Sequence, residues 1–329
     1  MFLDFFKRHP RLNLLIVLIS AAIFSCFTNQ LDPYYVQVIT LSAIYVTLAV
    51  SLNLVMGETG QFSLCHAAFM AVGAYASSCI TSYCLPKWFP NLQFTGDSFW
   101  SQVTFLPVLI AGGIAAGLAG FIVGVPSLRL RGDYLALVTL GFGEIIRVVL
   151  QNTDAVGGAR GMEAIPPATN LFWSIGAAAV VIYFSSSLVR STYGKGFHAV
   201  RDDELAAEST GIDTTAYKVT AFVWGAFFAG VAGALYAHCV EFISPDGFTY
   251  LKSIEILVMV VLGGMGQIGG VVVAAVFLTF LNEWLRQLAG YRIVAYSLMI
   301  ILLMILRPQG LLGGMGKWFE NKIFRSKNA

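Results

Sequence analysis

The chain has 329 residues, of which 57% are hydrophobic and only 12% are charged. Soluble domains carry about 25% charged residues, so this composition excludes a soluble globular protein. The net charge of +2 gives no reason to expect a nucleic-acid partner. A membrane-crossing helix needs about 20 mainly apolar residues, which leaves room for many crossings and little else. We therefore expect an all-α integral membrane protein, with residues 1–329 forming a single transmembrane domain.

Ten hydrophobic runs follow one another along the chain. They are Leu12–Phe27, Tyr34–Met56, Phe62–Leu85, Val103–Val125, Tyr134–Gln151, Leu171–Val189, Val219–Val240, Ile254–Gly263, Ile268–Leu281 and Tyr291–Leu306. The first run lacks a small-x-small cleavage site, so we expect a retained helix rather than a signal peptide. Ile254–Gly263 is too short to cross the roughly 30 Å bilayer core alone. Either it joins Ile268–Leu281 as one interrupted crossing, or the two are short, tilted or re-entrant elements.

The distribution of basic residues predicts the orientation. With ten crossings and the N-terminus inside, fourteen Lys and Arg residues lie on the inner side, in residues 1–11, 129–131, 190–218 and 307–329. Only four lie on the outer side, namely Lys87, Arg160, Lys252 and Arg286. The positive-inside rule favours this arrangement, whereas a single crossing by residues 254–281 would place the basic tail outside. We therefore expect a multi-pass protein, surrounded by lipid, with both termini cytoplasmic.

Two segments share the pattern V-x-G-x-x-G-Q, one at residues 55–61 and the other at residues 261–267. Both interrupt apolar runs on the predicted inner side. Glycine-interrupted helices in corresponding halves of a transporter indicate its translocation path. The path candidates from these segments are Asn53, Gly57, Gly60, Gln61, Gly263, Gly264 and Gly266. The alternative is a chance match between two glycine-rich turns.

Three charged residues lie in or beside apolar runs. Glu144 and Arg147 are three residues apart, so they share a helix face and can pair. Glu255 lies at the outer start of an interrupted run. Ionisable groups within a membrane indicate function, so all three join the path candidates. For Glu144 and Arg147 the alternative is an ion pair that tethers their helix to a neighbour near the outer surface.

The longest loop on the predicted inner side covers residues 190–218. Its residues 197–210 contain neither Gly nor Pro, and Val200, Leu205 and Ala206 form an apolar stripe among charged side chains. We expect one amphipathic helix over residues 197–211, of about three to four turns, with Gly211 at its C′ position. Such a helix either lies on lipid headgroups or docks into a cytoplasmic partner.

This stretch resembles the coupling segment of ABC-importer permeases, which reads E-A-A-x-x-x-G. Ala206, Ala207 and Gly211 match its spacing, although Leu205 occupies the position of the family's Glu and Glu204 comes one residue early. Four stretches are similar to branched-chain amino acid permeases of the LivM type: RDDELAAE at 201–208, LRLRGDYLALVTLGFGEIIR at 128–147, AFFAGVAGALYA at 226–237, and SIEIL at 253–257 with LGGMG at 262–266. The resemblance covers about residues 48–308.

The resemblance implies an ABC-importer permease, a polytopic bundle of about ten transmembrane helices with broken helices, in a bacterial inner (plasma) membrane. It implies a coupling loop at residues 190–218 and a cytoplasmic tail at residues 307–329. The partners it implies are a homologous second permease subunit, two ABC ATPase subunits and a periplasmic or extracellular substrate-binding protein. The ATPase-coupling residues it implies are Arg201, Asp202, Asp203, Glu204, Ala206, Ala207, Glu208 and Gly211.

The same resemblance implies import of branched-chain amino acids, with ATP used by the partner subunits. The sequence contains no G-x-x-x-x-G-K-[ST] phosphate loop, so we expect no ATPase activity in this chain. We also expect it to bind no cofactor and no metal. The alternatives are an ion-coupled secondary transporter, an integral membrane enzyme, and an ABC permease for urea or another amino acid.

Overall fold

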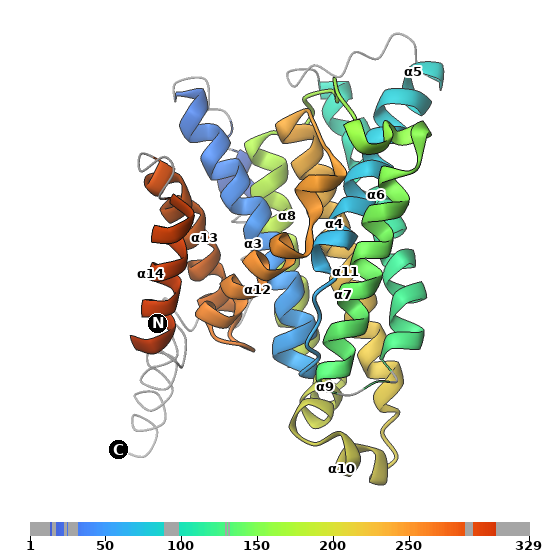
Figure 1. The fold of residues 1–329 in the computed structure, drawn as a ribbon, viewed down its shortest axis with the longest axis vertical. Helices are drawn as coiled ribbons and strands as arrows, with labels where there is room; N and C mark the ends of the chain where they lie inside the picture. Colours follow the sequence, from blue (N-terminus) through green and yellow to red (C-terminus); the bar gives the residue numbers. More distant parts are fainter. Residues whose placement is uncertain are drawn as a thin grey trace.

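The computed structural model describes residues 14, 18–22, 25, 32–88, 99–128, 130, 132–286 and 292–306. Within these residues the only regular secondary structure is helical, apart from one isolated β-bridge between Met162 and Ile243. The long helices are α3 (Pro33–Thr59), α4 (His66–Cys79), α6 (Phe99–Ser127), α7 (Asp133–Gln151), α8 (Leu171–Arg190) and α11 (Thr214–Val240). They form a bundle with roughly parallel axes (Figure 1).

Further helices and turns complete the described part of the chain. A π-helical turn at Ile80–Cys84 and α5 (Leu85–Trp88) extend α4. Between the long helices lie α9 (Thr192–Asp202), α10 (Glu204–Ser209) and the 3-10 turns Asp154–Val156 and Gly158–Arg160. A further 3-10 turn, Pro245–Phe248, follows α11. The last three helices are α12 (Tyr250–Gly263), α13 (Ile268–Trp284) and α14 (Arg292–Leu306).

Six helical stretches among the described residues are long and apolar enough to cross a membrane. They are Pro33–Thr59, His66–Lys87, Gln102–Ser127, Tyr134–Gln151, Leu171–Arg190 and Thr214–Val240. The predicted all-α, membrane-embedded fold class is therefore confirmed. Most of the first hydrophobic run and the whole tail at 307–329 lie outside the described residues. Ten crossings and the cytoplasmic placement of both termini stay predictions.

Helix α11 lies at the centre of the bundle and packs against α3, α4 and α6. Glycines make the closest approaches, because a Cβ at Gly73 of α4 would lie 2.2 Å from the Gly230 carbonyl oxygen of α11. A Cβ at Gly233 would lie 1.9 Å from the Met70 carbonyl oxygen. Small residues let membrane helices pack backbone to backbone where apolar burial alone provides little driving force.

The sequence explains where several helices begin. Asp32 caps α3, with its side chain accepting a hydrogen bond from Tyr34 N at 3.0 Å, and Pro33 occupies the first turn. Asp213 caps α11 by accepting one from Ala216 N at 3.0 Å. Carboxylates at these positions satisfy backbone N–H groups that have no partner within the helix.

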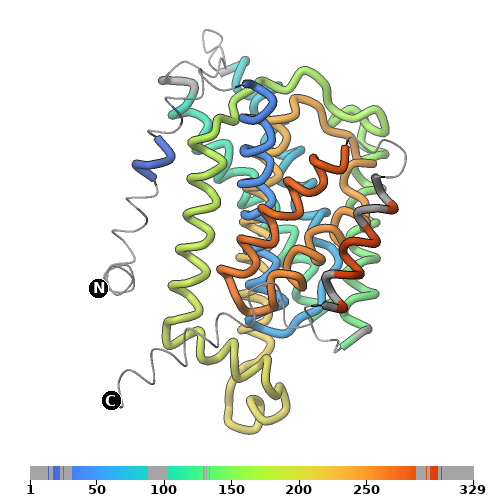
Figure 2. The backbone as a smooth tube through the Cα atoms, turned by 90° about the vertical axis from the view of Figure 1, so that its left-hand side faces the viewer, coloured from blue at the N-terminus to red at the C-terminus, as the bar shows by residue number. Residues whose placement is uncertain are grey.

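Helices α12 and α13 are joined by residues 264–267 and pack side by side. A Cβ at Gly263 would lie 2.4 Å from Val271 Cα, which shows that the chain reverses direction at this turn. Two short elements packed side by side are therefore present, as one of the two options predicted, and the number of crossings by residues 254–281 stays a prediction. Figure 2 shows α13 running obliquely beside the long helices.

Residues 192–209 form two helices, so the prediction of one helix over residues 197–211 is wrong. Helix α9 ends at Asp202, and Asp203 is extended, with φ −157°. The Asp203 carboxylate accepts hydrogen bonds from Leu205 N at 2.9 Å and Ala206 N at 3.0 Å. Asp203 thus starts α10 as its N-cap, which a continuous helix does not permit. Together α9 and α10 project beyond the ends of the long helices (Figures 1 and 2).

Candidate coupling site

The first glycine turn follows α3. The helix continues through Gly57, Glu58 and Thr59 and ends at Gly60, whose φ of 70° is left-handed. Gly57 is therefore helical, whereas the sequence pattern predicted that the whole segment from Gly57 to Gly60 would interrupt the helix. The predicted interruption begins instead at Gly60 and lasts until α4 starts at His66.

The second glycine turn breaks the chain more sharply. Helix α12 ends at Gly263, and Gly264 and Gly266 both have positive φ, at 94° and 79°. Residues with a Cβ rarely adopt these angles, so glycine is required at both positions. The predicted interruption at Gly263–Gly266 is confirmed.

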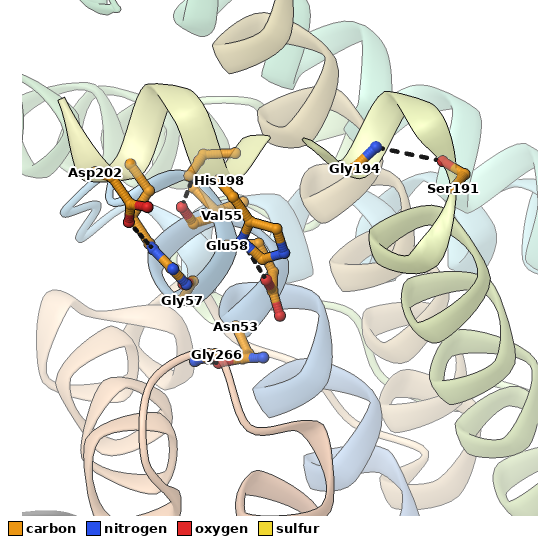
Figure 3. Close-up of polar contacts among 11 residues, drawn as sticks. Asn53, Val55, Gly57, Glu58, Ser191, Gly194, His198, Asp202 and Gly266 are labelled. Atoms are coloured by element: carbon orange, nitrogen blue, oxygen red, sulfur yellow. Dashed lines mark hydrogen bonds and ion pairs between the residues drawn. The ribbon is translucent and has the colours of Figure 1, made fainter. Parts of the chain in front are cut away.

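The two turns, far apart in sequence, meet in space. The Gly266 N–H donates a 2.9 Å hydrogen bond to Asn53 Oδ1, one turn before Gly57 on α3 (Figure 3). A Cβ at Gly57 would lie 2.3 Å from Gly266 N and 2.3 Å from Asn53 Oδ1. Only a glycine at position 57 leaves room for the second turn to reach Asn53.

Arg201, at the end of α9, contacts this junction. Its Nη1 donates to the Gly57 carbonyl oxygen at 3.2 Å, and its Nε lies 3.2 Å from Asp202 Oδ1. A Cβ at Gly60 would lie 3.2 Å from Arg201 Cγ. We call the group formed by Asn53, Gly57, Gly60, Gly266 and Arg201 the turn junction. It joins α3, the α12–α13 turn and α9 in one place.

A second set of contacts anchors α10 to the start of α11. Glu204 Oε2 lies 2.5 Å from Nζ of Lys218, a residue only 5% exposed. The Thr214 hydroxyl donates to Glu208 Oε1 at 3.0 Å. The Gln61 side chain, beyond the first turn, donates to the Lys218 carbonyl oxygen at 3.3 Å. Two of the four predicted coupling acids, Glu204 and Glu208, therefore contact α11 of this chain.

The outer surface of α10 is formed by other residues. Leu205 is 63% exposed, and Ala206 is exposed beside it, whereas Ala207 is only 4% exposed. Gly211 has φ 85°, and its N–H donates to the Glu208 carbonyl oxygen. The Ile212 N–H donates to the Ala207 carbonyl oxygen, which completes a Schellman motif. The predicted C′ role of Gly211 is confirmed.

The charged path candidates lie apart from the turn junction. Glu144 and Arg147 of α7 form the ion pair that their spacing predicts, with Nε 2.7 Å from Oε2. Arg147 also reaches Asp246, in the 3-10 turn before α12, at 3.2 Å. Glu255 of α12 pairs with Lys252 at 2.8 Å. The contact with Asp246 agrees with the tether that the sequence offered as an alternative for Arg147.

Sequence reasoning missed three residues near the junction. Glu58 lies within the first glycine pattern but is not among the predicted path candidates, although a carboxylate in an apolar run is itself a signal. His198 Nδ1 lies 3.7 Å from Glu58 Oε2 (Figure 3). Lys218 counted only as a basic loop residue, and nothing in the sequence shows that Glu204 would pair with it.

Comparison with known proteins identifies the family. A family model described as the permease component of branched-chain amino acid transport systems matches residues 34–307. The chain belongs to this permease family. Its members are components of ABC importers, which work with ATPase and substrate-binding partners. This membership confirms the resemblance and the prediction of a transport subunit.

Individual relatives agree with the family. The chain is 36% identical to the high-affinity branched-chain amino acid permease LivM of Salmonella typhimurium, over 84% of this chain and 69% of the relative. LivM of Escherichia coli K12 gives the same figures. The autoinducer 2 import permease LsrC of Escherichia coli DH10B is 26% identical, over 85% of this chain and 81% of the relative. No solved structure matches this chain.

Proposed function

We propose that this chain is the membrane-spanning permease subunit of an ABC importer that carries leucine, isoleucine and valine into the cell. The family match and the 36% identity to two LivM permeases support this substrate class over the more distant autoinducer 2 permeases. The chain binds no ATP or other cofactor. A homologous second permease, two ATPase subunits and an external substrate-binding protein complete the importer in a bacterial inner membrane.

The observation that carries this proposal is that the α9–α10 segment has both an exposed surface and a separate contact with the glycine turns. Its projecting end presents Leu205 and Ala206, while its Arg201 donates to the Gly57 carbonyl oxygen within the turn junction. We assign the α9–α10 end to the cytoplasm, as the basic residues predict, together with both termini. A partner ATPase that displaces α10 then moves Arg201, and Arg201 moves the second glycine turn against the first. Backbone that is irregular at membrane depth lines a cavity in other transporters, so the turns are where the path opens.

Reconstitution tests the function. The full chain is purified with its partner subunits and placed in liposomes, and leucine uptake and ATP hydrolysis are measured together. We expect ATP-dependent leucine uptake. Removing the charge-assisted hydrogen bond of Arg201 with Arg201→Ala should lower uptake per ATP roughly tenfold. Arg286→Ala is the control, because Arg286 is exposed and interacts with Glu283 and Tyr34, which lie away from the turn junction. Leucine uptake that proceeds without ATP would refute the proposal.

Crosslinking tests the docking surface. A cysteine at Ala206 should crosslink to the ATPase subunit, because Ala206 is exposed on α10. A cysteine at Ala207 should not, because Ala207 is buried against its own segment. Labelling of Ala206→Cys by an impermeant reagent from outside intact cells would place α10 on the wrong side of the membrane.

A further inference from the structure

An open pocket of about 560 Å³ lies between α3, α8 and α13, directly beside the turn junction. Its lining includes Glu58 from the last turn of α3 and Gly266 from the second glycine turn. The pocket is therefore at the α9–α10 end of the molecule, and any movement of the second turn changes its wall.

One side of the pocket holds a buried carboxylate. Glu58 is 2% exposed, and its Oε2 has no hydrogen-bond partner among the described residues. His198 Nδ1, at 3.7 Å, is beyond hydrogen-bond distance. Burying a carboxylate oxygen without a hydrogen bond costs free energy, which a cationic donor from a ligand would recover. The chemistry of this side therefore favours an ammonium group.

The other groups of the pocket are basic and aliphatic. Arg190, the last residue of α8, lines it and is exposed. A guanidinium binds a carboxylate through two parallel hydrogen bonds. The remaining large side chains of the lining are branched aliphatics, namely Ile182, Val189, Ile268 and Val272. An acid, a base and an aliphatic wall in one pocket match the three parts of a branched-chain amino acid.

We propose that this pocket is a low-affinity binding site for a small aliphatic zwitterion on the α9–α10 side. Glu58 receives the ammonium group, Arg190 receives the carboxylate, and the aliphatic wall receives the side chain. The inference rests on the proposed function for the choice of leucine as ligand. It adds a residue-level site where the substrate rests after passing the glycine turns, before it leaves the protein.

Protection of an introduced cysteine tests the site. Gly269 lines the pocket, and a Cβ there meets nothing within 4 Å, so Gly269→Cys fits. Inside-out vesicles with the assembled importer are labelled with N-ethylmaleimide, with wild-type labelling subtracted as background. At about ten times its Kd, leucine should slow labelling about tenfold, because about one site in eleven stays free. Lys195→Cys, exposed on α9 and outside the pocket, is the control whose labelling leucine should not change.

Ligand and protein variants test the charges. Leucinamide lacks the carboxylate and 4-methylpentanoate lacks the ammonium group, so each should protect at about tenfold or higher concentration than leucine. Glu58→Gln and Arg190→Gln, added to Gly269→Cys, should each raise the leucine concentration needed by a similar factor. Equal protection by all three compounds, or protection unchanged in Glu58→Gln, would overturn the site.

The same vesicles separate this inference from the proposed function. The highest leucine concentration used is 50 mM, about the practical limit for such a weak site. If ATP-driven leucine uptake proceeds but this concentration leaves Gly269→Cys labelling unchanged, the pocket is not a leucine site. The importer function then still stands. If the complex takes up no leucine, the proposed function fails, and protection of Gly269→Cys still decides whether the pocket binds a zwitterion.

Discussion

The turns that follow α3 and α12 carry the same V-x-G-x-x-G-Q pattern but differ in structure. After α3, the helix continues to Thr59 and only Gly60 is left-handed. After α12, the helix stops at Gly263, and both Gly264 and Gly266 have positive φ. The fourth residue of the pattern explains the difference. Glu58 of the first segment favours a helix, whereas Gly264 at the same position of the second segment disfavours it, so α12 ends there.

The final glutamines differ as well. Gln61 is buried and donates to Thr59 Oγ1 at 2.8 Å and to the Lys218 carbonyl oxygen at 3.3 Å, whereas Gln267 is exposed. The first turn is thus fixed to α11 and the second is held mainly by Asn53. The comparison suggests that the first turn is the stationary side of the junction and the second is the side that moves.

The largest expected effect comes from closing the space between the turns. Gly57→Val places a branched side chain where a Cβ alone would lie 2.3 Å from Gly266 N. We expect leucine uptake to be nearly abolished at matched expression, because the second turn can no longer reach Asn53. Gly141→Val is the control, since a Cβ at Gly141 of α7 meets nothing within 4 Å. Gly112→Val is a poor control, because its Cβ would lie 3.0 Å from the Gly73 carbonyl oxygen.

A smaller effect should follow from straining the second turn. Gly264→Val forces a β-branched residue to φ 94°, at a cost of about 1–3 kcal/mol. Thermal unfolding in detergent should show a lower midpoint, and uptake should fall while ATP hydrolysis loses its dependence on loaded binding protein. Gly141→Ala provides the comparison, because it adds a methyl group in open space, without positive φ and away from the pocket. Normal uptake by Gly264→Val would make this turn an ordinary connector.

The smallest expected effect tests the two glutamines against each other. Gln61→Ala removes the hydrogen bond to the Lys218 carbonyl oxygen and should destabilise the protein by about 1 kcal/mol. Gln267→Ala should change the unfolding midpoint little, because Gln267 is exposed. Equal losses from both variants would contradict the idea that only the first turn is fixed to α11.

Much of this architecture could be predicted from the sequence. Apolar runs predict helices because lipid leaves the backbone no partner outside its own hydrogen bonds. The spacing of Glu144 and Arg147 predicts their ion pair, and the position of Gly211 predicts a helix end. These features depend on neighbours within a few residues, so local sequence is sufficient to find them.

The rest depended on contacts distant in sequence. An amphipathic pattern over residues 197–211 does not reveal that the Asp203 carboxylate caps a new helix. It also does not tell which partner a charged side chain will meet. Arg201 and Glu204 were expected at an ATPase surface, yet Arg201 contacts α3 and Glu204 contacts α11. Only the packing of the whole bundle determines such pairings.

The glycine contacts between α4 and α11 have a consequence for how the protein changes shape. At Gly73 and Gly230 the two backbones touch without any side chain between them, and Gly233 meets Met70 in the same way. Two helices can slide past each other when the side chains between them repack, but two backbones in direct contact resist such sliding. We therefore expect α4 and α11 to keep a fixed register through the transport cycle and to behave as one rigid body. The hinge of the transport cycle then lies outside this pair of helices. We expect homologous permeases to keep glycine at the positions of Gly73, Gly230 and Gly233.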